Sequence, residues 1–240
     1  MTQRTAGYQL PPDWPTTEAE ATAVQLRLRE RVERCPESAD GADGTGGPVV
    51  GAGTVVGVDV AYDDDRDVVA AAAVALDGAT LEVLATATAV GRVAFPYVPG
   101  LLAFREIPAV LGALERLDRT PDLVVCDGYG LAHPRRFGLA SHLGVLTGLP
   151  TIGVAKNPFT FRFEAPGPHR GDWSPLLDGG EEVGRALRTR EGVKPVFVSV
   201  GHRVGLAAAC AHTLALARDY RLPETTRRAD ALCRAALRAG

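Results

Sequence analysis

The sequence predicts an α/β protein built on one mixed sheet with helices on its faces. Three apolar runs, at 54–62, 68–76 and 80–90, are separated by the stretches DDDRD and DG. Apolar runs interrupted by such turn signals are typical of an antiparallel meander. After residue 100, apolar spacing typical of helices alternates with short strand-like runs. A three-stranded antiparallel meander followed by parallel strands favours one mixed sheet, with functional sites where its strands end.

Local patterns place the individual elements. Residues 17–34 carry apolar side chains among charges at helical spacing, with Thr16 or Thr17 as a cap. Residues 36–53 are rich in Gly, Pro, Ser and Asp, which indicates a flexible surface connection to a core over 54–230. The later elements are expected as helices at 101–117, 135–148, 204–219 and 225–238, and as strands at 122–127, 151–155, 185–190 and 195–200.

Composition limits the class of protein. The chain has 240 residues, of which 46% are hydrophobic and 23% charged, as expected for a single globular domain over 1–240. It has neither an N-terminal signal pattern nor a long apolar run, so we expect a cytoplasmic protein with no membrane contact. We also expect a monomer. Four cysteines without a C-x-x-C pair argue against a zinc ribbon or a disulfide framework. The net charge of −3 neither suggests nor excludes nucleic-acid binding.

Three carboxylates occupy unfavourable positions. Asp59 interrupts an apolar strand, Asp127 closes another before a glycine-containing loop, and Glu106 lies on a helix whose other inner positions are apolar. Each alone also fits a structural role, such as capping a turn or pairing with an arginine. Together they supply the hard oxygen ligands that Mg²⁺ prefers, with positions left for water and phosphate oxygens.

Several motifs then carry a resemblance to a known family. They are GVDVAY (57–62), FPYVPGLLAFREIPA (95–109), DGYGLAHPRRFGLASHLG (127–144), GVAK (153–156), GHRVGLAAA (201–209) and YRLPETTRRAD (220–230). Over about residues 53–230 the chain resembles endonuclease V, a family of deoxyinosine-specific nucleases. The resemblance implies a ribonuclease H-like mixed sheet.

The resemblance also implies roles for particular residues. Asp59, Glu106 and Asp127 become the metal-binding carboxylates of the cleavage site. His133 is expected beside the scissile phosphate, where Lys156 would stabilise phosphate charge. His202, at the end of a further predicted strand, is expected to contact a metal or to assist from outside the metal shell.

The loop FPYVPG resembles the family's device for recognising a lesion. Pro96 and Pro99 fix the backbone on either side of Tyr97 and Val98, so that the tyrosine ring is presented as a rigid wedge. A surface turn with a partly buried tyrosine is the structural alternative. A wedge suits an enzyme that extrudes a poorly paired base such as hypoxanthine.

Two further groups of residues are expected to contact nucleic acid. A pocket for the extruded base is predicted from Leu102, Gly128, Gly130, Gly138 and Leu139. Nearby, Phe159 replaces a smaller aliphatic side chain that we would expect, which bears on base selectivity. Phosphate contacts are expected from a basic rim of Arg105, Arg135, Arg136, Lys156, Arg162 and Arg203.

The reaction implied is Mg²⁺-assisted hydrolysis of DNA containing deoxyinosine, double- or single-stranded, with Mn²⁺ as another usable ion. By the family's pattern the cut falls at the second phosphodiester 3′ to the lesion and leaves 3′-hydroxyl and 5′-phosphate ends. Three alternatives stay open: a ribonuclease specific for inosine in RNA, a nucleic-acid-binding module without turnover, and a phosphate-binding α/β protein.

Overall fold

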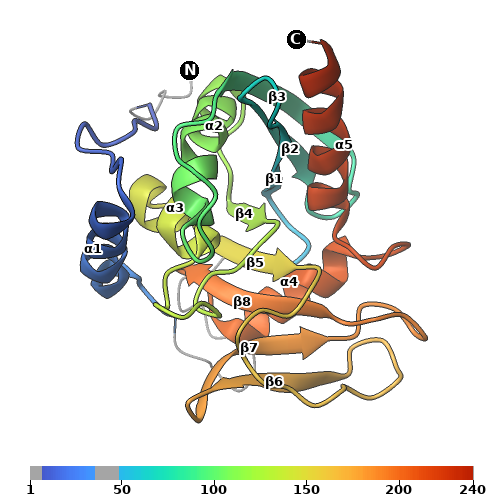
Figure 1. Cartoon of the computed structure of the whole chain (residues 1–240). Coiled ribbons are helices and arrows are strands. Elements are labelled where there is room, and N and C mark those ends of the chain that lie inside the picture. Colours follow the sequence, from blue (N-terminus) through green and yellow to red (C-terminus); the bar gives the residue numbers. More distant parts are fainter. Residues whose placement is uncertain (1–6, 36–48, 240) are drawn as a thin grey trace.

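One sheet contains every strand in the part of the chain that the computed structural model describes, residues 7–35 and 49–239. Its eight strands follow the order β3-β2-β1-β4-β5-β8-β7-β6. Helices cover both faces of this sheet (Figure 1). The predicted α/β architecture with one mixed sheet is confirmed.

The first three strands form the predicted antiparallel meander. They are β1 (Thr54–Asp63), β2 (Val68–Asp77) and β3 (Val83–Arg92). β2 is buried on both faces, which explains its almost uninterrupted apolar sequence. Alternate alanines of this strand belong to different cores, since Ala71 and Ala73 pack with α2 whereas Ala72 packs with α5. Small side chains at these positions leave room for a helix on each face.

Beyond β1 the sheet is parallel for two strands and then antiparallel. β4 (Leu123–Cys126) pairs parallel to β1, and β5 (Thr151–Ala155) parallel to β4. The prediction of parallel strands is therefore correct for these two. β8 (Val196–His202) and β7 (Glu181–Leu187) continue the sheet antiparallel. The edge strand β6 (Trp173–Asp178), which includes a proline, was not predicted.

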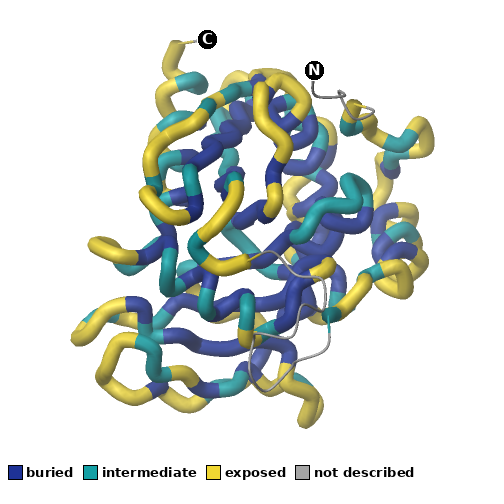
Figure 2. Tube along the Cα trace, turned by 180° about the vertical axis from the view of Figure 1, so that it is seen from behind, coloured by how far each residue is buried: buried dark blue, intermediate teal, exposed yellow. Residues whose placement is uncertain are grey.

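Two pairs of helices enclose the sheet. α2 (Leu102–Arg116) and α3 (Leu139–Thr147) pack on one face, and α4 (Leu206–Leu216) and α5 (Glu224–Ala239) on the other. The central strands are largely buried, while much of the edge strand β3, the turns and the strand ends at the margins are exposed (Figure 2). In the described residues no helix combines the length and apolar character that crossing a membrane requires.

The N-terminal helix is shorter than predicted. α1 (Glu18–Leu28) begins with a capping box between Thr17 and Glu20 and ends in a 3₁₀ turn at 29–31. Its buried positions are Ala21, Gln25 and Leu28, whereas the expected apolar Leu26 is exposed.

Other expected boundaries also differ, and one expected segment lies mostly outside the described residues. The helix predicted at 135–148 begins only at Leu139, because backbone hydrogen bonds among residues 129–138 form turns before it. The predicted flexible connection at 36–53 lies mostly outside the described residues, since 36–48 are not described.

Candidate functional site

Two aspartates lie side by side where β1 and β4 run parallel. Val58 of β1 is paired with Cys126 of β4, and an aspartate follows each of them, Asp59 and Asp127. Parallel strands in register bring successive residues to the same level of the sheet. Residues 68 positions apart in sequence are thereby placed side by side.

The third predicted acid reaches the same place from α2. Glu106 is 6% exposed, and its Oε1 accepts a hydrogen bond of 3.2 Å from the Tyr62 hydroxyl. Burial first, and then the charge of Asp59, raise the pKa of Glu106 to about 8. A buried carboxyl with so little compensation is costly to ionise without a cation nearby.

Lys156 supplies positive charge beside one aspartate. Its Nζ lies 2.5 Å from Oδ2 of Asp127, just beyond the end of β5. Burial opposes the ammonium charge, but the hydrogen bond and the charge of Asp127 outweigh it and raise the pKa of Lys156. This lysine is therefore protonated at neutral pH.

A fourth acid, Asp230 of α5, was missed by the sequence analysis. Burial and the charge of Asp127 raise the pKa of Asp59, and Asp230 adds to that rise. Asp230 also forms an ion pair with Arg234, with 2.9 Å between Oδ1 and Nε. An acid next to the buried Ala229 on an amphipathic helix was the available signal, although it was quoted only within a longer motif.

The carboxylate oxygens of these acids suit a hard divalent cation, although each of the three predicted acids is bound to a different group of the protein. Asp59 Oδ1 accepts from the Val60 amide at 2.8 Å, Glu106 is bound by Tyr62, and Asp127 by Lys156. Accordingly, within residues 7–35 and 49–239 no three His, Cys, Asp or Glu side chains converge in a geometry that holds a metal. The excess of buried acidic oxygen is nevertheless the chemistry that Mg²⁺ compensates.

A cavity of about 200 Å³ adjoins the acids. Gly128 and Tyr129, the residues directly after Asp127, form part of its wall. The structure brings into this wall most of the predicted base pocket and much of the predicted wedge. Its lining comprises Gln25, Tyr97, Val98, Pro99, Gly100, Leu102, Ala103, Gly128, Tyr129, His133, Gly138, Leu139 and Phe159.

The predicted wedge is exposed at its tip. The Tyr97 residue is 68% exposed, and Pro96 and Pro99 beside it are exposed as well. Val98 is partly buried against the cluster around Phe95 and anchors the loop. The Tyr97 side chain is therefore more exposed than the alternative of a surface turn with a partly buried tyrosine predicts.

Aromatic rings line the cavity at Phe159, where a smaller aliphatic side chain was expected. Phe159 stacks on Tyr129 with ring centroids 5.8 Å apart and lies 6.1 Å from His133. Phe159 is 41% exposed, so that its ring is available at the cavity. Tyr129 was not predicted from the sequence, although its position directly after a predicted strand end and a glycine was a usable signal.

The prediction that Gly130 lines the base pocket is wrong. It does not line the cavity, and its amide donates to Ser199 Oγ at 2.8 Å. A Cβ at this position would lie 1.9 Å from the Val200 carbonyl oxygen. The glycine is needed for close packing of this loop against β8.

His133 lies at the cavity, but its ring nitrogens are occupied within the protein. Nε2 is 3.0 Å from the Gly100 carbonyl oxygen, and Nδ1 accepts from the Arg135 amide at 3.2 Å. Burial, and then the charge of Arg135, lower the pKa of His133 to about 4. The ring is neutral, and the expected contact with phosphate is not available to it in this arrangement.

His202 is placed at the wrong end of the sheet to bind the predicted metal. β8 runs antiparallel to β5, so His202 pairs with Thr151 at the start of β5, whereas Lys156 follows the other end of β5. Its Nδ1 accepts from the Glu33 amide at 3.1 Å. The neighbouring Arg203 is paired with Glu33 and is likewise remote from the acids.

Of the other predicted phosphate contacts, Arg105, Arg135 and Arg136 are bound to protein groups. Arg105 pairs with Asp64 at 2.5 Å, and Arg136 pairs with Asp178 and Glu181 on the β6–β7 hairpin. Arg135 is bound to the loop that carries the wedge, as detailed below. Arg162 is exposed next to the cavity-side segment that holds Phe159.

A family model described as Endonuclease V matches residues 45–231. The chain belongs to the Endonuclease V family. Its relative in Streptomyces coelicolor, an Endonuclease V, is 72% identical over 98% of this chain and 97% of the relative. Members of this family are nucleases, and the chain is accordingly an endonuclease.

Solved Endonuclease V structures share the fold. The crystal structure of Endonuclease V from Streptomyces avermitilis is 68% identical and superimposes with a TM-score of 0.87 over 98% of this chain and 99% of that one. Endonuclease V of Ciona intestinalis was solved in complex with a DNA containing an inosine followed by a ribo-adenosine. It is 27% identical, with a TM-score of 0.76 over 92% of this chain and 98% of that one. The ribonuclease H-like architecture is thus confirmed.

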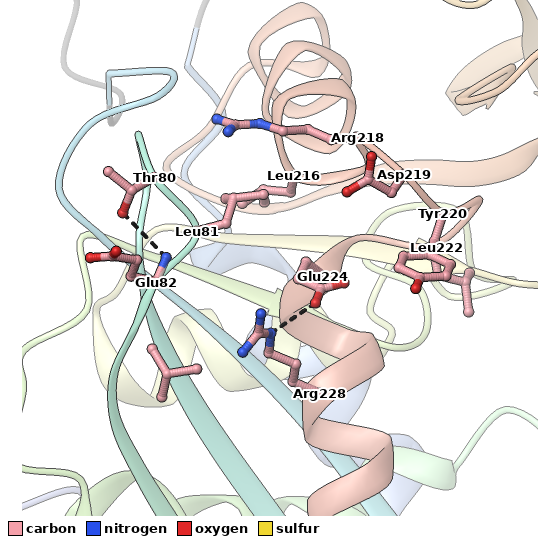
Figure 3. Close-up of a pocket in the computed structure, with 11 residues that line it drawn as sticks. Thr80, Leu81, Glu82, Leu216, Arg218, Asp219, Tyr220, Leu222, Glu224 and Arg228 are labelled. Atoms are coloured by element: carbon pink, nitrogen blue, oxygen red, sulfur yellow. Dashed lines mark hydrogen bonds and ion pairs between the residues drawn. The ribbon is translucent and has the colours of Figure 1, made fainter.

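A second, larger cavity of this Endonuclease V chain lies away from the acids. It measures about 530 Å³ and is formed by the β2–β3 turn and the segment joining α4 to α5 (Figure 3). Asp77 at the end of β2 pairs with Thr54 at the start of β1, so this cavity lies at the opposite end of β1 from the acids. Glu224 and Arg228 in its wall bind each other.

Proposed function

We propose that the chain recognises deoxyinosine in DNA and hydrolyses the second phosphodiester 3′ to the lesion, leaving 3′-hydroxyl and 5′-phosphate ends. The carrying observation is the continuity of two sites. Asp127 belongs to the acidic cluster, and Gly128 and Tyr129 directly after it line the cavity below Tyr97. A base held in the cavity therefore brings its own backbone close to the acids.

In this proposal the acids bind Mg²⁺ and the lysine binds phosphate. Asp59, Glu106, Asp127 and Asp230 would hold the ion, with Mn²⁺ as a substitute. When bound, a divalent ion stabilises charge on the phosphate as a Lewis acid. Lys156, moving from Asp127 to a phosphate oxygen, would add positive charge at the same place and leave Asp127 free to bind.

Lesion recognition is assigned to the loop and the cavity. Tyr97 is exposed enough to enter a base stack, and the ring would replace part of the stacking lost when a base is extruded. In the lining of the same cavity, the exposed ring of Phe159 stacked on Tyr129 offers a flat surface for the extruded base. Backbone of Gly128 and Gly138 in the same wall allows close approach to base edges.

An RNA substrate is the second candidate. The Ciona intestinalis relative was solved with a DNA in which a ribo-adenosine follows the inosine, and this supports testing RNA as a substrate. The same acids would serve in either case, because DNA and RNA share the phosphodiester that is cut. Recognition of a hypoxanthine base likewise does not require a deoxyribose. Substrate choice therefore needs direct measurement.

The decisive experiment is a nicking assay with Mg²⁺ or EDTA. Matched duplexes would contain one deoxyinosine or none, and a third substrate would be RNA with one inosine. We expect Mg²⁺-dependent cutting of the deoxyinosine duplex at the second 3′ phosphodiester. Faster cutting of the RNA would favour the second candidate, and equal cutting of all substrates would contradict lesion recognition.

A variant separates turnover from binding alone. Asp59→Asn keeps the size of the side chain but removes a proposed ligand, so we expect cleavage to be lost while DNA binding remains. Asp118→Asn, at an exposed site after α2, is the matched control and should cut normally. Undiminished cleavage by Asp59→Asn would show that the acidic cluster is not the catalytic centre.

A further inference from the structure

Gln25 of α1 is a polar side chain at a fully buried position. It is 0% exposed, and every polar atom of its side chain is hydrogen-bonded. Nε2 donates to the carbonyl oxygens of Gly100 at 3.0 Å and Phe137 at 3.1 Å, and Oε1 accepts from Arg135 Nε at 2.5 Å. Carbonyls only accept and a guanidinium only donates, so these partners fix the orientation of the amide.

The two carbonyls that share the Gln25 amide belong to two separate segments at the smaller cavity, of which Gly100 lines it directly and Phe137 directly precedes the lining residue Gly138. Gly100 ends the loop that presents Tyr97 and precedes Leu102 of α2. Phe137 precedes Gly138 and Leu139, where α3 begins. Gln25 Nε2 therefore links the loop that carries Tyr97 to the segment that precedes α3.

The Gly100 carbonyl oxygen is the centre of the arrangement. Besides Gln25, it is approached by Arg135 Nη2 at 2.8 Å and His133 Nε2 at 3.0 Å. Gly100 has φ of +81°, and a Cβ there would lie 2.9 Å from Arg135 Nη2. The glycine thus permits a left-handed turn and the close approach of the guanidinium.

The rest of α1 and the segment before it support the same loop. Ala21 packs into the cluster formed by Phe95, Leu101 and Phe104 at both ends of the loop. Trp14 Nε1 donates to the Phe104 carbonyl oxygen at 3.3 Å. These contacts hold the ends of the loop, whereas Gln25 joins the loop at Gly100 to the segment at Phe137, with Arg135 and His133 bound to the same Gly100 carbonyl.

We propose that Gln25 is a positioning residue that fixes the width of the lesion cavity, holding the Tyr97 loop against the wall at Phe137 while His133 and Arg135 hold the same carbonyl. The proposal rests on the proposed function of this cavity. It gives His133 a role in positioning the loop in place of contact with the scissile phosphate. Lesion selectivity then depends on a helix that contributes no group to the reaction.

Two substitutions of Gln25 test this role. Gln25→Met keeps the length of the side chain and removes all three hydrogen bonds. Gln25→Glu keeps an acceptor for Arg135 but removes the donor that joins the two walls, and it serves if the methionine variant does not fold. Thr17→Ala removes the capping box and weakens α1 without touching the cavity, which makes it the control for helix stability.

The measurements are Kd for a deoxyinosine duplex and its undamaged match, the KM and kcat of cleavage, and the fluorescence of 2-aminopurine placed next to the lesion. We expect both Gln25 variants to raise Kd and KM for the lesion on the order of 10-fold and to reduce the 2-aminopurine signal. Binding to undamaged DNA and kcat should change less than about 2-fold. Thr17→Ala should lower Tm and keep the preference for the lesion.

Three results would overturn the role. If the wild type prefers the lesion and Gln25→Met or Gln25→Glu keeps that preference, the role fails while the proposed function stands. If Thr17→Ala loses the preference to the same extent, helix stability and not Gln25 is responsible. If the wild type binds both duplexes equally, the proposed function fails and this role with it.

Discussion

Lys156 places its Nζ 2.5 Å from Oδ2 of Asp127, so that the cation and one of the proposed metal-binding acids neutralise each other. The pair joins the end of β5 to the end of β4. Because the ammonium occupies an oxygen proposed to bind the ion, binding of metal and phosphate requires the lysine to move. In the proposed function, the acids and the lysine therefore form a site that substrate and ion would complete together.

Replacement of Lys156 should affect turnover more than binding of the ion. For Lys156→Met we expect kcat to fall on the order of 100-fold, since one preorganised charge at the phosphate is lost. The Mg²⁺ concentration for half-maximal cleavage should stay the same or decrease, because Asp127 no longer has a competing partner. Single-turnover nicking over a Mg²⁺ titration measures both quantities, and an unchanged kcat would contradict the role.

Asp59 should lower the folding stability of the protein when no ion is bound and contribute to binding of the ion. Burial and the neighbouring acids disfavour its charged form, so Asp59→Asn should be more stable than the wild type in EDTA, by on the order of 1 kcal/mol. Mg²⁺ should raise the Tm of the wild type by mass action and that of the variant much less. Calorimetry with and without Mg²⁺ tests this, with Asp118→Asn as control. A Mg²⁺ response retained by Asp59→Asn would speak against the site.

Tyr97 should act on recognition of the lesion. Stacking of one ring on a base contributes about 1–3 kcal/mol, so Tyr97→Ala should weaken binding to a deoxyinosine duplex on the order of 10-fold. Cleavage of a mismatched substrate at saturation should slow less than that. Tyr220→Ala, another exposed tyrosine at the remote cavity, is the control. Equal losses in binding and in the cleavage step would count against a wedge.

His142 should make the protein sensitive to acid. It is 0% exposed among Trp14, Phe104 and Phe137, and neither ring nitrogen has a hydrogen-bond partner in the described residues. Burial lowers the pKa of His142 to about 3. The unfolded chain takes up this proton near pH 6.5, so the contribution is complete above that pH and is lost as pH falls toward 3.

The size of this effect follows from the two pKa values. Between pH 7.5 and pH 5 the wild type should lose about 2 kcal/mol through this residue. His142→Phe, which keeps a ring in the aromatic cluster, should lose correspondingly less, as measured by urea unfolding at both values. The exposed His169→Gln variant is the control. Parallel pH dependence in wild type and His142→Phe would exclude the explanation.

Particular residues show which parts of the site can be predicted from local sequence pattern and which cannot. Asp59 and Asp127 could be chosen from sequence because each is an acid in or directly after an apolar strand, a local feature. Asp230 was missed because its α5 environment looks like an ordinary charged helix face, and only packing of α5 on β1 gives it acidic neighbours. His202 was misplaced because the direction of β8 in the sheet is not written in its own residues.

The sequence by itself determined the meander, the later alternation of helices and strands, and the acids that interrupt apolar runs, since hydrophobic period and turn chemistry are local. Tertiary structure alone decided which end of the sheet each loop joins and which basic groups are already paired. It also decided that a buried glutamine of the first helix ties Gly100 to Phe137. Those contacts join residues 75 and 112 positions apart, and such distant contacts are set by how elements pack.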